Sequence, residues 1–178
     1  MNTLFQLAAL FDAVTEIEGR KKLQKTVHIL QEFGIPFGVS FGYHHYGPFS
    51  EQLQDCLQSA QHDSLICETE VPGPTPTFRF KADERLTGLW KMLGNESPPK
   101  WAEFATELNR KSPRELETIS TLVYLEKLRG AGTPKEEIDS EFKTLKPHLA
   151  GKLDAARQTL IEFRQKFPAE KLGILQVA

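Results

Sequence analysis

The sequence holds only two cysteines, Cys56 and Cys67, and no long hydrophobic run. Two cysteines do not make a disulfide framework, so a reduced, cytoplasmic protein is the expectation. No apolar stretch approaches the roughly 20 residues that span a bilayer, and the segment Met1–Leu4 lacks the basic side chains that open a secretion signal. The sequence therefore predicts a cytoplasmic protein with no membrane partner.

An excess of positive charge is also missing. The 178 residues include 22 Lys+Arg and 24 Asp+Glu, which gives a net charge of -2. Proteins that bind duplex DNA usually neutralise its phosphates with clustered lysine and arginine. The net charge therefore disfavours nucleic acid as a partner. Nucleic acid would have to bind through a local basic patch. A hydrophobic content of 39% is too high for a disordered chain and fits a globular protein.

The usual signatures of catalysis are absent. There is no Gly-x-Ser-x-Gly turn, and the glycines at 34, 38 and 42 lack the Lys-Ser/Thr ending of a phosphate-binding loop. Cys56 falls on the apolar stripe of an expected helix, where cysteines usually serve as inert packing residues. The sequence therefore predicts no enzyme, no catalytic residue and no cofactor.

Candidate metal ligands are few and poorly spaced. They are His28, His44, His45, Cys56, His62 and Cys67. Zinc sites usually show closely spaced ligand pairs, and adjacent residues such as His44 and His45 point to opposite faces of a strand. We therefore expect no metal, and we expect His28 at the edge of a helix packing face.

The first half of the chain has the pattern of a winged helix. Apolar residues at steps of three and four predict helices over residues 3–15 and 21–33 and a third helix from Ser50. Strands are expected over 39–46, 65–71 and 77–81, the last two joined by a proline-rich loop at 72–76. In this arrangement the third helix takes the recognition position and the proline-rich loop is the wing.

The second half is expected to be helical throughout. A helix is predicted over 84–93, and Ser112 and Thr133 each begin a capping box with proline at the next position. A last long helix is predicted from Leu149 to about Phe167. The fold class is therefore mostly α with a small β-sheet. We expect a winged-helix-like unit at 1–82, with a C-terminal helical bundle at 83–178 packed against it as one globule.

Four cations gather at the start of the second helix: Arg20, Lys21, Lys22 and Lys25. They could bind a partner, or they could form an ordinary solvated helix face. Cations at a helix N-terminus oppose the macrodipole by a few tenths of a kcal/mol each. The cluster is therefore the candidate partner-binding site.

An aromatic turn, Tyr46-Gly47-Pro48-Phe49, precedes the third helix. Aromatic rings at such a turn are expected to pack as a core plug that sets the direction of the helix. The alternative is an exposed turn that forms a binding surface.

The pairing of Gly19–Leu30 with the turn at Tyr46–Ser50 resembles the YwgA-like family. More distantly it resembles the Panacea (SocA-like) antitoxin domain, which has its own Lys-Leu-Gln-Lys helix and aromatic-Gly-Pro turn. A weaker likeness to YwgA-like proteins covers Glu115–Leu125 and Lys146-Pro147. The Panacea domain more often has aliphatic residues where this chain has Phe49 and Ser50. Neither resemblance brings a catalytic residue.

The leading functional hypothesis is a non-enzymatic, cytoplasmic protein-binding module, such as an antitoxin-like or defence-associated accessory subunit. The alternative is a winged-helix transcriptional regulator that binds DNA. The expected recognition helix contains no lysine or arginine, and its Glu51 and Asp55 would repel a phosphate backbone. For a third hypothesis, a metal-dependent nuclease or hydrolase, the sequence offers no set of metal ligands. The sequence does not identify the partner protein or an oligomeric state.

Overall fold

The computed structural model describes residues 3–74, 76–92, 94 and 98–174. Over this part of the chain the fold is mostly helical with small antiparallel sheets, as predicted. The first half contains α1 (Thr3–Ala13), β1 (Glu16–Glu18), α2 (Arg20–Glu32), β2 (Gly42–His44), β3 (Gly47–Phe49), α3 (Glu51–His62), β4 (Ile66–Val71) and β5 (Thr77–Ala82). The second half contains α4 (Glu84–Met92), α5 (Ala102–Arg110), α6 (Pro113–Arg129), α7 (Lys135–Leu145), the 3-10 helix η1 (Pro147–Lys152), α8 (Leu153–Lys166) and α9 (Ala169–Leu172).

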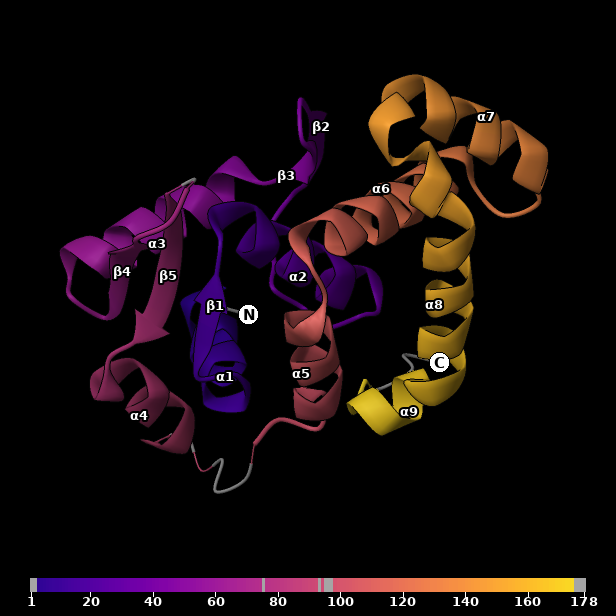
Figure 1. Ribbon diagram of the computed structural model, residues 1–178. Coiled ribbons are helices and arrows are strands. Elements are labelled where there is room, and N and C mark those ends of the chain that lie inside the picture. The colour runs from indigo at the N-terminus through magenta and orange to yellow at the C-terminus, as the bar shows by residue number, and fades with distance from the viewer. Residues whose placement is uncertain (1–2, 75, 93, 95–97, 175–178) are drawn as a thin grey trace.

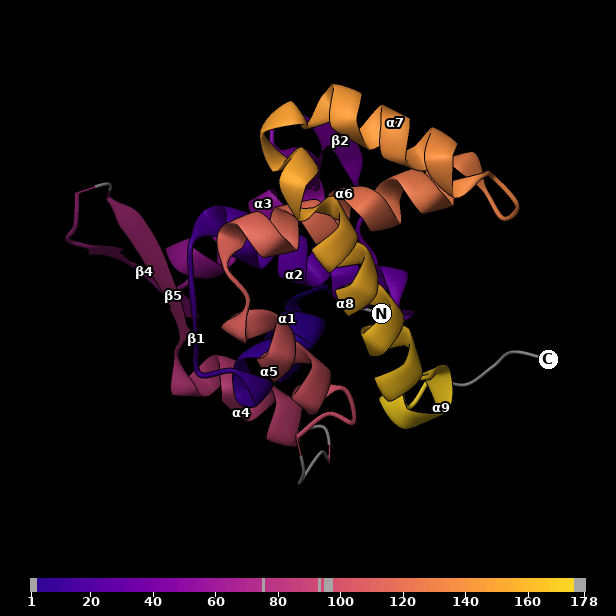
Figure 2. The ribbon, with the colours of Figure 1, turned by 45° about the vertical axis from the view of Figure 1, so that its right-hand side comes forward.

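A three-stranded antiparallel sheet with the order β1-β5-β4 lies at one edge of the helices (Figures 1 and 2). The strands predicted at 65–71 and 77–81 are confirmed as β4 and β5, which pair along their whole length. Thr75, in the expected proline-rich loop, lies outside the described residues. The strand β1 was not predicted, because its three residues are too few for an alternating pattern to be recognised. Pairing with β5 fixes this strand and buries Ile17 completely.

The strand predicted at 39–46 is wrong over its first half. Val39 is bound by a side chain instead of a neighbouring strand, since its carbonyl accepts from Gln31 Nε2 at 2.7 Å and its N–H donates to Gln31 Oε1 at 3.2 Å. Only residues 42–44 of this segment form a strand, β2, which pairs with β3 in a separate two-stranded hairpin, and His45 and Tyr46 form its turn. The side chain of Gln31 therefore makes the hydrogen bonds to the Val39 backbone that were expected from a neighbouring strand.

Helix boundaries in the second half follow the predictions, with two exceptions. The capping box at Ser112 is confirmed, with Ser112 and Glu115 each bonding the other's backbone. The box expected at Thr133 is wrong: the N-cap of α7 is Pro134, and Thr133 Oγ1 donates back to the Arg129 carbonyl at 3.1 Å. The last long helix was predicted to begin at Leu149, but residues 149–152 belong to the 3-10 helix η1 and α8 begins at Leu153. The predicted apolar stripe of this helix is buried.

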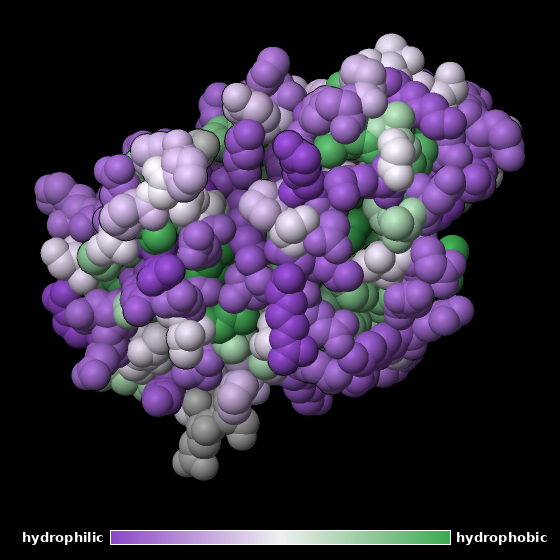
Figure 3. All heavy atoms as spheres, in the orientation of Figure 1, coloured by the Kyte–Doolittle hydropathy of each residue, from purple (hydrophilic) through white to green (hydrophobic). Residues whose placement is uncertain are grey.

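The core is continuous between the two halves of the chain. The helix α2 packs on α6 and α5, α1 packs on α4 and α5, and α6 packs on α8. Leu7, Leu23, Phe104, Leu122 and Leu160 are all at most 1% exposed and belong to one hydrophobic cluster. Hydrophilic side chains dominate the face seen in Figure 3, with hydrophobic ones scattered between them. Among the described helices, none combines the length and hydropathy needed to cross a membrane.

Candidate functional site

The start of α2 is set by a glycine turn. Gly19 has a φ of 107°, which other residues rarely adopt, and its N–H donates to the Phe78 carbonyl at 2.7 Å. The chain therefore leaves β1 beside β5 and turns at once into α2. This turn places the predicted basic cluster, Arg20, Lys21, Lys22 and Lys25, in the first two turns of the helix.

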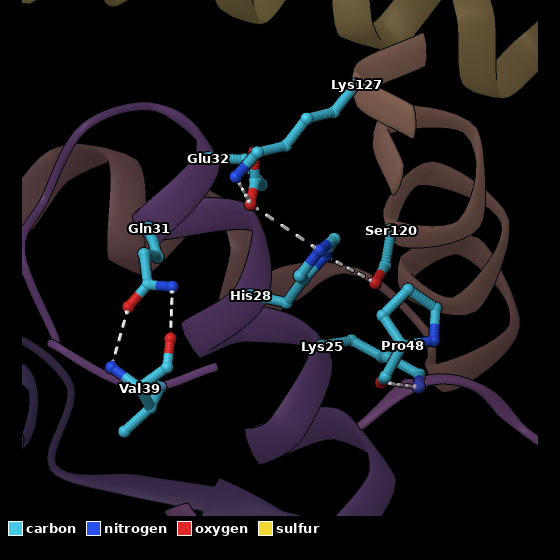
Figure 4. A network of polar contacts seen from close by, with 8 residues as sticks. All are labelled: Lys25, His28, Gln31, Glu32, Val39, Pro48, Ser120 and Lys127. Atoms are coloured by element: carbon cyan, nitrogen blue, oxygen red, sulfur yellow. Dashed lines mark hydrogen bonds and ion pairs between the residues drawn. The ribbon is translucent and has the colours of Figure 1, made fainter. Parts of the chain in front are cut away.

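Gln24 and Lys25 hold the β2–β3 hairpin. Gln24 donates from Nε2 to the Ser50 carbonyl at 3.0 Å, and its Oε1 accepts from the Ser50 N–H at 3.1 Å. Lys25 is 2% exposed and donates from Nζ to the Pro48 carbonyl (Figure 4). Leu23 is buried in the core. Gln24 and Lys25 of the Lys-Leu-Gln-Lys segment thus bond α2 to the Gly-Pro hairpin, and Lys25, predicted as a partner-binding residue, is buried.

A second buried lysine holds the hairpin from the other side. Lys146 donates from Nζ to the His45 carbonyl at 2.9 Å and to Glu117 Oε1 at 2.7 Å. Gly47 lies nearby with a φ of +81°, and a Cβ at this position would be 2.9 Å from Thr121 Oγ1. The two segments of weaker likeness to YwgA-like proteins, one in α6 and one after α7, therefore meet beneath the hairpin.

The cluster beneath the hairpin is electrostatically unbalanced. Burial lowers the pKa of Lys25 to about 8; Glu117 opposes this shift, while Lys146 and Lys21 add to it. Burial, followed by the effect of Glu117, raises the pKa of Tyr43 to about 12. Lys146 is paired with Glu117, whereas Lys25 donates to a carbonyl, so one positive charge among these three side chains is unbalanced when both lysines are protonated.

A pocket of about 340 Å³ opens between the start of α2, the hairpin and α3. We call it the hairpin pocket. It is lined by Arg20, Lys21, Gln24, Lys25, His44, His45, Tyr46, Gly47, Phe49 and Gln54. Lys21 Nζ lies 3.2 Å from the centroid of the Tyr46 ring, a cation–π contact at the rim. The basic cluster and the aromatic turn thus meet at one pocket, although they are separate features of the sequence.

The prediction of a core plug at Tyr46-Gly47-Pro48-Phe49 is correct only for its middle. Gly47 and Pro48 are buried and Phe49 is half-buried, but Tyr46 is 51% exposed. Tyr46 is exposed because it forms, with His45, the two-residue tip of the β2–β3 hairpin. The strand β3 ends next to Ser50, whose Oγ accepts from the Leu53 N–H at 3.1 Å as the N-cap of α3. The hairpin therefore sets where α3 begins and leaves one ring open to solvent.

The four predicted cations take different roles. Lys22 donates from Nζ to the Asn109 carbonyl on α5, and burial lowers its pKa against the opposing effect of Glu18. Arg20 Nε lies 2.5 Å from Glu68 Oε1, so its charge is shared with β4. Lys21 is exposed and, among the described residues, makes no ion pair. Lys21 is therefore the cation most available to a partner.

His28 lies one turn beyond Lys25 and is 1% exposed, so the expectation of an edge position is wrong. Its Nδ1 is 2.9 Å from Ser120 Oγ, and its Nε2 is 3.9 Å from Glu32 Oε1 (Figure 4). Burial, with Lys25 and Lys127 adding to it, lowers the pKa of His28 to about 3. Serine, histidine and glutamate also make up hydrolase triads, but Ser120 is completely buried and offers no nucleophile to solvent.

The metal candidates do not come together. Within the described ranges, no three His, Cys, Asp or Glu side chains gather as metal ligands would. His44 and His45 are exposed on the hairpin. Cys56 is half-buried on α3, and burial raises the pKa of its thiol, as in a packing cysteine.

Comparison with known proteins gives one informative similarity. No family model matches the chain. The chain is 27% identical to the uncharacterized protein YwgA of Bacillus subtilis (strain 168) over 161 residues, which cover 90% of this chain and 95% of that protein. The similarity therefore extends over nearly the whole fold and confirms the predicted resemblance to YwgA-like proteins.

Proposed function

Taking the chain as YwgA-like, we propose that it is a non-enzymatic protein-binding module of the cytoplasm, of the antitoxin-like or defence-associated accessory type. The observation that carries this proposal is the hairpin pocket. Its rim combines a cation without an ion-pair partner among the described residues, Lys21, with an exposed ring, Tyr46. Aromatic and basic side chains that meet at one hollow are typical of protein interfaces, where they anchor a partner.

The alternative function is DNA binding by a winged helix. Apart from the β2–β3 hairpin between α2 and α3, the succession α1, β1, α2, α3, β4, β5 and the sheet order β1-β5-β4 resemble those of a winged helix, and this likeness supports the alternative. The charges favour a protein partner. The exposed side of α3, where a recognition helix would meet DNA, carries Glu51, Asp55, Gln58 and His62 and no lysine or arginine.

The proposal is tested by capturing the tagged protein from its native cells and identifying what co-purifies. The wild-type chain and Lys21→Glu are compared, with Lys91→Glu as the matched control because Lys91 is an exposed lysine on α4, away from the pocket. We expect a defined protein that is retained by wild type and by Lys91→Glu and is lost with Lys21→Glu. Specific binding to a DNA duplex that weakens steeply with salt would support the alternative.

A further inference from the structure

We propose that the hairpin pocket binds one short acidic segment of a partner protein. A large apolar side chain of that segment would lie between Tyr46 and Phe49, with a neighbouring carboxylate at Lys21. This inference rests on the proposed function and names the chemistry of its partner.

The size and lining of the pocket favour an inserted side chain. A hollow of about 340 Å³ is at the small end of the range for ligand pockets, which begins at roughly 300 Å³. The rings of Tyr46 and Phe49 and the stem of Lys21 supply apolar surface, and Tyr46 is already 51% exposed. Covering this surface with an apolar side chain removes it from water, which stabilises a complex in proportion to the apolar area buried.

The charges favour a carboxylate beside that side chain. The described residues that line the pocket include Arg20, Lys21 and Lys25 and no carboxylate. Beneath it, Lys146 is paired with Glu117 and Lys25 donates to the Pro48 carbonyl, so positive charge exceeds negative charge among these three side chains. A carboxylate at the rim would be attracted both by the cations that line the pocket and by those beneath it.

The acidic side chains of α3 limit the length of the occupant. Glu51 and Asp55 are exposed on α3, close in the helix to Gln54, which lines the pocket. They would repel a long polyanion that continued past the pocket, such as a nucleic acid backbone. A short segment with its acids near Lys21 avoids this repulsion.

The test selects binders to the full-length chain from a random-peptide phage library and measures the affinity of one synthesised peptide by fluorescence anisotropy. We expect the selected peptides to share one large apolar residue flanked by Asp or Glu. Lys21→Glu and Tyr46→Ala should each weaken binding by about tenfold or more, as for central interface residues, while Lys91→Glu leaves it unchanged. Thermal unfolding checks that each variant is folded.

The remaining outcomes separate this inference from the proposed function. A selection that yields no binder, peptides without acidic residues, or binding that survives both pocket variants would overturn the inference. If the captured partner protein still binds and the acidic peptide does not compete with it, the inference fails while the proposed function stands. A single-stranded oligonucleotide that displaces the peptide would overturn both.

Discussion

One turn after the exposed Lys21 on α2, Lys25 is 2% exposed and its ammonium group donates to a backbone carbonyl. In the sequence it is one of four similar cations, and nothing in the spacing separates it from Lys21. In the structure Lys25 is buried against the Pro48 carbonyl, because α2 is covered by α6, α5 and the hairpin at once. Periodicity identifies the apolar stripe of a helix but cannot predict how many neighbours cover its polar side.

Charge reversal should therefore affect the two lysines differently. Lys25→Glu places a carboxylate beside a carbonyl and near Glu117, and we expect a loss of about 3 kcal/mol or more in the free energy of unfolding, as for a broken buried charge contact. Lys21→Glu is a surface change and should cost less than about 0.5 kcal/mol. Urea unfolding measures both. Equal effects of the two substitutions would contradict the buried position of Lys25.

His28 predicts a pH dependence of stability. Its pKa is about 3 in the folded protein against 6.5 for the free side chain, so the unfolded state binds the extra proton between these values. Stability should therefore fall as pH is lowered from 6.5 toward 3. In His28→Phe this contribution is absent, so the decline in melting temperature over that range should be shallower. Parallel declines in the two proteins would show that His28 titrates normally.

At the scale of elements, the β2–β3 hairpin depends on Gly47. Gly47→Ala combines an unfavourable φ of +81° with a Cβ 2.9 Å from Thr121 Oγ1. Gly130→Ala is the matched control, because Gly130 has a φ of +87° and nothing within 4 Å of an added Cβ. We expect the control to lose about 1 kcal/mol from backbone strain and Gly47→Ala to lose roughly 1–3 kcal/mol more from the clash. Chemical denaturation compares them, and similar losses would argue against a tight hairpin.

Helices and strands were predictable from the sequence where their hydrophobic pattern runs over enough residues. The amphipathic helices and the strands β4 and β5 have clear periods, and Ser112 has a complete capping sequence that forms. Thr133 has the same local signature, yet its hydroxyl bonds Arg129 instead. The pairing of β1 with β5 and the binding of Val39 by Gln31 are tertiary contacts, and no local pattern indicates them.

At the scale of the whole molecule, the candidate site depends on distant segments. The sequence identifies the basic cluster and the aromatic turn but not their shared pocket, and it misses the support from Glu117 and Lys146. The bond from Lys146 to the His45 carbonyl joins residues 101 positions apart. A resemblance to a family can mark such segments, but only the fold shows that they meet.

The extensive packing between residues 1–82 and 83–178 predicts one cooperative unit. The helix α2 lies against α6, and α1 lies against α4 and α5, so separating the two regions would expose core residues on both. Limited proteolysis near residue 83 should therefore give fragments that do not fold separately, and thermal unfolding should show a single transition. Two stable, separately folding fragments would contradict this prediction.

Hydrogen–deuterium exchange of the full chain, with and without its captured partner, shows most directly whether the hairpin pocket binds that partner. The account predicts that protection on binding concentrates in the backbone of residues 20–25 and 43–54, which carry the hairpin pocket. Protection confined to α7 and α8, or to residues 55–62 of α3 and the β4–β5 hairpin, with the pocket segments unchanged, would contradict this expectation.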